Sequence, residues 1–83
     1  MQMHEGILTV NLESGMYEIF LTEYSERMPL FNGDEFLIMV GGDWKNTKIV
    51  FSETEDDWVL DGIDIKDWGI GSMVKVELLS EEE

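Results

Sequence analysis

The sequence predicts a mostly β fold, a single small antiparallel β-barrel that is SH3-like in shape and has about six short strands. Alanine, the best helix former, is absent, whereas β-branched and aromatic residues are plentiful. Short apolar runs are separated by turn signals at regular intervals, which is typical of small barrels and sandwiches. We expect one domain over residues 1–79 and a frayed acidic tail over residues 80–83.

Residues 6–12 and 16–22 are predicted to be strands that pair across a turn at residues 13–15. One face of the first strand is expected to carry Leu8, Val10 and Leu12. Apolar residues of the predicted strands also fall on the second face, among them Ile7, Phe20, Leu37 and Met39. Strands with two apolar faces suit a closed barrel or a sheet that offers one face to a partner.

Residues 23–32 break the alternation, and Pro29 excludes a central strand position because it has no N–H group. We therefore expect a loop. Residues 33–51 follow as the clearest hairpin of the chain, with a tight turn at Gly41-Gly42-Asp43, because glycine adopts a positive φ at no steric cost. One face of this hairpin is expected to carry Phe36, Ile38, Val40, Thr47, Ile49 and Phe51.

An acidic turn at residues 52–57 leads into a short strand at residues 58–62 and an irregular glycine-containing loop at residues 62–71. Residues 72–79 are predicted to form the last strand. Its core-facing side chains are expected to be Val74, Val76 and Leu78.

The chain carries 19 acidic and 5 basic residues, giving a formal net charge of −14. Such a surface repels phosphates and anionic lipids, so we expect no direct nucleic-acid or membrane binding, and basic proteins as partners. The sequence has no cysteine, which excludes disulfides and thiolate chemistry. No apolar run spans a bilayer and no signal peptide begins the chain, so a soluble, cytoplasmic protein is expected.

Catalytic and metal sites are disfavoured by the residues available. His4 is the only histidine and is expected to be solvated near a flexible terminus. Asp61, Asp64 and Asp67 provide oxygen ligands of the kind Ca²⁺ prefers, but their spacing differs from the EF-hand pattern. No phosphate-binding glycine loop or His-Glu-x-x-His sequence is present. We therefore expect a binding protein without cofactor or metal, not an enzyme.

The three tryptophans differ in their expected roles. Trp44 and Trp58 lie within predicted strands and are expected to join the core. Trp68 lies in a loop between Asp67 and Gly69 and is the best candidate for an exposed anchor that contacts a partner.

The pattern Gly6-Ile-Leu, Tyr17-Glu-Ile, Gly42-x-Trp44-x-x-Thr47-x-Ile49 and Trp58-x-Leu60-x-Gly62 extends over nearly the whole chain. It resembles a family of small proteins of unknown function found in conjugative elements and phages of Gram-positive bacteria. The resemblance implies a compact β-barrel and a mobile-element setting, and it transfers no catalytic residue.

The densest acidic stretch holds seven carboxylates against the single Lys66, and they are Glu53, Glu55, Asp56, Asp57, Asp61, Asp64 and Asp67. Carboxylates spaced along a turn and a neighbouring loop can imitate a row of phosphates. With Trp68, they predict a nucleic-acid mimic that occludes a basic surface of a host or competing-element protein, as anti-restriction and anti-CRISPR proteins do. Two alternatives remain: acidity that only maintains solubility, and an assembly module whose apolar sheet faces bind a partner or a second copy as a homodimer.

Overall fold

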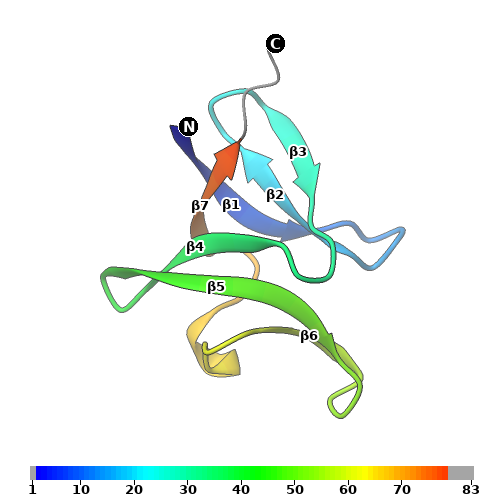
Figure 1. Cartoon of the computed structure of the whole chain (residues 1–83). Coiled ribbons are helices and arrows are strands. Elements are labelled where there is room, and N and C mark those ends of the chain that lie inside the picture. Colours follow the sequence, from blue (N-terminus) through cyan, green and yellow to red (C-terminus); the bar gives the residue numbers. More distant parts are fainter. Residues whose placement is uncertain (1, 79–83) are drawn as a thin grey trace.

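The computed structural model describes residues 2–78, and within that range the chain forms seven strands, one short 3₁₀ helix and no α-helix (Figure 1). The elements are β1 (Gln2–Val10), β2 (Tyr17–Leu21), β3 (Glu26–Pro29), β4 (Glu35–Val40), β5 (Asp43–Ser52), β6 (Asp57–Leu60), η1 (Ile65–Asp67) and β7 (Met73–Leu78). The mostly β, antiparallel fold is confirmed. Six strands were expected, and the structure has seven. They form one sheet in the order β3-β2-β1-β7-β4-β5-β6. This sheet is not closed, so a barrel is not confirmed.

The sheet consists of two three-stranded meanders that β7 joins. β7 pairs with β1 on one side and with β4 on the other. Figure 1 shows the meander β4–β5–β6 crossing beneath the meander β1–β2–β3, with β7 between them. Gly6 and Ile7 pair with both β2 and β7, so β1 crosses from one neighbour to the other at this point. The sheet therefore curls around its own apolar face.

The core lies inside this curl and draws on both meanders. Its buried side chains are Leu8, Ile19, Leu21, Leu30, Phe36, Ile38, Ile49, Leu60, Val74 and Val76. Most of them were expected from the period-2 pattern, because successive side chains of a strand point to opposite faces. Tyr17, Trp58 and Trp68 pack against the edge of this cluster.

The first strand is displaced from its predicted position. β1 begins at Gln2, four residues before the predicted start, and ends at Val10. Leu12, expected on the same strand face as Leu8 and Val10, lies beyond the strand and is 91% exposed. The reason is Asn11, whose side-chain oxygen accepts the N–H groups of Glu13 (2.9 Å) and Ser14 (3.3 Å) and so begins the turn.

His4 is buried, so the expectation of a solvated terminal histidine is wrong. It occupies an inward-facing position of β1 opposite Val76 and is 9% exposed. Its Nδ1 atom lies 3.2 Å from the hydroxyl of Tyr24 and 3.5 Å from Oε1 of Glu23. The imidazole thus connects the start of β1 to the turn between β2 and β3.

Residues 26–29 form the edge strand β3, where a loop was expected. Leu30 N–H donates to the carbonyl of Tyr17 at 3.0 Å. Because hydrogen bonding alternates along an antiparallel pair, Met28 also bonds to β2, whereas Pro29 points to the free edge. Proline therefore costs no ladder hydrogen bond, and it withdraws a donor from the edge.

The opposite edge strand, β6, is capped in a different way. Asp61 N–H donates to the carbonyl of Lys48 at 2.9 Å, so by the same alternation Trp58 directs its N–H to the free side. That N–H is taken up by Oδ1 of Asp57 at 2.8 Å. Each edge strand therefore has one fewer free N–H group available for pairing with a further strand.

The hairpin of β4 and β5 is confirmed. Gly41 and Gly42 form its turn, with φ angles of 60° and 90°, and Val40 lies opposite Asp43. Trp44, expected in the core, lies instead on the outer face of the sheet, where its ring stacks beneath Nζ of Lys75 at 4.6 Å from the centroid.

The last segments follow the prediction closely. β6 covers residues 57–60, the loop after it contains η1, and Val74 and Val76 of β7 are buried. The predicted core position of Leu78 and the tail at residues 80–83 lie outside the described side chains.

Candidate acidic binding surface

The predicted acidic residues lie at the two ends of β6. Glu53, Glu55 and Asp56 occupy the turn between β5 and β6, and Asp57 begins the strand. Asp61, Asp64 and Asp67 follow it, and all seven side chains are exposed. Figure 1 places this turn and the loop with η1 at opposite ends of β6. The edge strand therefore carries negative charge at both ends.

Three of the seven carboxylates also stabilise local structure or face a basic neighbour. Asp57 caps the N–H of Trp58, and Oδ1 of Asp64 accepts the N–H of Lys66 (3.2 Å) at the start of η1. Asp61 lies beside Lys48. The side chains of Glu53, Glu55 and Asp67 make no hydrogen bond to other described residues, so they are available to a partner.

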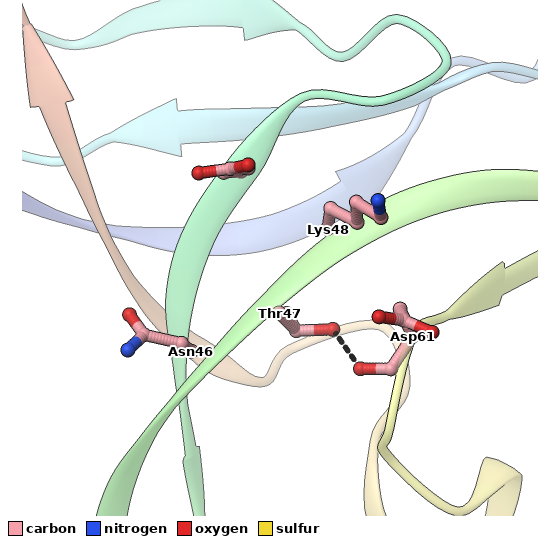
Figure 2. Close-up of a pocket in the computed structure, with 5 residues that line it drawn as sticks. Asn46, Thr47, Lys48 and Asp61 are labelled. Atoms are coloured by element: carbon pink, nitrogen blue, oxygen red, sulfur yellow. Dashed lines mark hydrogen bonds between the residues drawn. The ribbon is translucent and has the colours of Figure 1, made fainter.

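Asp61 belongs to a row of charges that crosses three strands. Glu35 pairs with Lys48 across β4 and β5, and Lys48 in turn lies opposite Asp61. These residues line a hollow of about 400 Å³ together with Asn46 and Thr47 (Figure 2). The hydroxyl of Thr47 donates to the carbonyl of Asp61 at 2.7 Å and holds the end of β6 against β5. Lys48 and Asp61 therefore bring opposite charges to the same hollow.

Trp68 is partly buried, so it is not a fully exposed anchor. It meets Tyr17 edge to face, with ring centroids 5.6 Å apart, and its Nε1 is buried without a hydrogen-bond partner among the described residues. Trp58 meets Phe51 in the same manner at 5.3 Å. These aromatic rings pack where the open sheet brings β2 and β6 towards each other.

Exposed apolar side chains that were not predicted from the sequence lie near the carboxylates. Phe51, at the end of β5, is 43% exposed, Ile65 is 66% exposed and Ile70 is 60% exposed. Phe51 was expected to continue the core face of β5, but the strand extends past the core there. The surface at β6 therefore combines carboxylates with exposed apolar side chains.

The acidic turn also acts on Tyr17. Burial raises the pKa of the Tyr17 hydroxyl above its ordinary value of 10.0, and the negative charge of Asp57 raises it further. The unfolded chain therefore loses this proton at a lower pH than the folded chain, and the contribution to stability is lost as pH rises from 10 through the folded pKa.

We expect Tyr17→Phe to flatten the alkaline part of the stability profile. The free energy of unfolding of the wild type should fall more steeply above pH 10 than that of the variant, because the raised pKa of Tyr17 no longer contributes. Urea unfolding between pH 8 and pH 11 measures the difference, and Tyr24→Phe is the matched control. Equal slopes for the wild type and Tyr17→Phe would contradict the assignment.

A family model described as "Domain of unknown function (DUF5348)" matches residues 6–70. The chain belongs to this family. The matched region of the DUF5348 domain contains all seven carboxylates and Trp68, whereas His4 and β7 lie outside it. No curated protein and no solved structure matches the chain.

Two further properties bear on the kinds of site that this DUF5348 domain can hold. Among residues 2–78, no group of three or more His, Asp or Glu side chains is placed to hold a metal ion, so Asp61, Asp64 and Asp67 do not converge. In the same range, no helix has the length and apolar character needed to cross a bilayer.

Proposed function

We propose that this protein acts by binding, and that its acidic β6 edge occupies a basic, nucleic-acid-binding surface of another protein. The observation that carries the proposal is the grouping of carboxylates at both ends of one edge strand, with the exposed Phe51, Ile65 and Ile70 beside them. A purely solubilising surface needs charge but not exposed apolar side chains.

The spacing of the charges supports nucleic-acid mimicry. Asp57 and Asp61 are four residues apart along β6, which corresponds to about 13 Å at a rise of roughly 3.3 Å per residue. The major groove of DNA, which separates two rows of phosphates, is about 12 Å wide. Carboxylates at the two ends of β6 can therefore meet basic side chains that otherwise contact phosphates on either side of a groove.

The resemblance to proteins of mobile elements gives this binding a context. In the cytoplasm of a bacterial host, an incoming element gains from blocking a restriction or CRISPR effector, whose DNA-binding surface is basic. Long-range attraction would make association fast at low ionic strength. It would weaken as the Debye length falls from about 8 Å at 0.15 M salt to about 3 Å at 1 M.

The test uses Glu53, Glu55 and Asp67, whose side chains make no hydrogen bond to other described residues. The variant Glu53→Lys, Glu55→Lys, Asp67→Lys changes the net charge from −14 to −8, since each reversal adds two charges. We expect it to lose partner binding at least 100-fold while its melting temperature stays near that of the wild type. The measurement is an affinity pull-down from host lysate, with parallel washes in low salt, high salt and duplex DNA.

The matched control is Glu13→Lys, Glu26→Lys, Asp43→Lys, which makes the same change in net charge at exposed sites away from β6. It should keep the partner captured by the wild type. Release by both salt and duplex DNA is expected. A captured partner that neither salt nor duplex DNA releases, or that the β6 variant still binds, would overturn the proposal. Equal losses of binding in the β6 variant and the control variant would show an effect of net charge alone and would also overturn it.

A further inference from the structure

A groove on the outer face of the sheet arises where β4 and β7 diverge. The two strands pair only at Leu37 with Lys75 and at Ile38 with Val74. One further step along the outer face in the same register would place Glu35 opposite Glu77. The strands have separated there, and a hollow of about 270 Å³ lies between these residues.

Two acidic residues, one amide and three apolar residues line the hollow. It is lined by Met3, Glu35, Phe36, Leu37, Asn46 and Glu77. It adjoins the hollow of Figure 2, because Glu35 and Asn46 line both.

The carboxylates of Glu35 and Glu77 lack a basic neighbour inside the hollow. The described side chains that line it include no lysine or arginine. Lys48 lies on the far side of Glu35, between it and Asp61, and Lys75 is held over the ring of Trp44. Two carboxylates that line one hollow both attract a cation placed between them.

We propose that this groove binds an arginine side chain in an extended segment of a partner protein. The guanidinium lies between Glu35 and Glu77, and the aliphatic stem contacts Met3 and Leu37. The groove is separate from the β6 edge, and the inference does not depend on the function proposed for that edge.

The chemistry of the lining selects arginine. A guanidinium presents donors on two sides in a fixed plane and can bond two carboxylates at once, whereas an ammonium is a compact, strongly hydrated charge. Long basic side chains also cover apolar surface with their methylene groups. Met3, which is 45% exposed, provides such a surface next to the charges. Among the described residues, no group of three or more His, Asp or Glu side chains is placed to hold a metal ion here.

The experiment is a titration followed by ¹⁵N-HSQC spectra at 150 mM salt. The probe is the peptide acetyl-Ala-Arg-Ala-Leu-amide, and its counterpart with citrulline in place of arginine has nearly the same shape without the charge. We expect saturable shifts at residues 35–37, 46 and 77 with the arginine peptide. The citrulline peptide should bind at least tenfold more weakly.

Two variants locate the effect. Glu35→Gln, Glu77→Gln should weaken the arginine peptide at least tenfold, whereas Glu13→Gln, Glu26→Gln, with the same loss of charge, should change binding less than twofold. The dispersion of each spectrum reports whether the variant is folded. Equal binding of the two peptides, shifts confined to the β6 edge, or equal losses in the two variants would each overturn the inference.

Discussion

Replacing Ile38 by alanine is expected to lower the free energy of unfolding by about 2–5 kcal/mol. Ile38 is completely buried at the centre of β4, between Lys45 on β5 and Val74 on β7. The substitution removes buried methylene and methyl groups and leaves a cavity where the two meanders meet. A domain of this size has roughly 4–12 kcal/mol in total, so a large share of its stability would be lost.

Leu37→Ala provides the matched control for Ile38→Ala. Leu37 is the neighbouring residue of the same strand and loses the same number of carbon atoms, but it lies half-buried on the outer face. We expect it to cost less than half as much as Ile38→Ala. Urea unfolding followed by tryptophan fluorescence measures both. If Leu37→Ala lowered the free energy of unfolding as much as Ile38→Ala, the assignment of the core to the Ile38 face of β4 would be wrong.

Replacing Gly6 by alanine is expected to cost about 1–3 kcal/mol because β1 and β2 approach too closely to accept a methyl group. A Cβ atom built at Gly6 would lie 2.6 Å from Cγ2 of Ile19 and 2.6 Å from the carbonyl oxygen of Phe20. The first contact involves the branch at Cβ of Ile19, which is completely buried and stiff, so it cannot rotate away freely. The second involves backbone within the ladder, so the strands must separate where β1 crosses from β7 to β2.

Gly69→Ala is the control for Gly6→Ala, because a Cβ atom at Gly69 meets no atom within 4 Å. Its effect on stability should lie within about 1 kcal/mol of zero and in the stabilising direction, since alanine reduces the freedom of the unfolded chain. Thermal unfolding of the two variants separates close packing from backbone freedom. If Gly6→Ala had the same melting temperature as the wild type, the close contact between β1 and β2 at Gly6 would be contradicted.

Local patterns predicted the parts of the fold that depend on neighbouring residues. The Gly41-Gly42 turn, the alternation of Phe36 and Ile38, and the buried faces of β5 and β7 all follow from turn chemistry and from period 2. The predictions that were wrong concern parts of the fold that depend on distant segments. β3 forms because β2 offers it a ladder, and the burial of His4 depends on β7 and on the turn after β2.

The candidate site was predictable as composition but not as geometry. The sequence indicates where the carboxylates are dense, and the structure places them at both ends of β6. No sequence signal reported that Lys48 would lie next to Asp61, because that contact is set by strand register. One weak feature of the sequence could have predicted that Ile65 and Ile70 are exposed. They lie in a glycine-containing loop, which provides few neighbours to cover them.

The central position of β7 also determines the order in which the chain can be assembled during synthesis. Each meander consists of neighbouring strands and can form as soon as its own residues leave the ribosome. The seam between the meanders requires residues 73–78, the last strand to appear. Until then both halves expose apolar faces without a shared core. A chain that stops at residue 70 would hold the two three-stranded meanders without the strand that pairs with both.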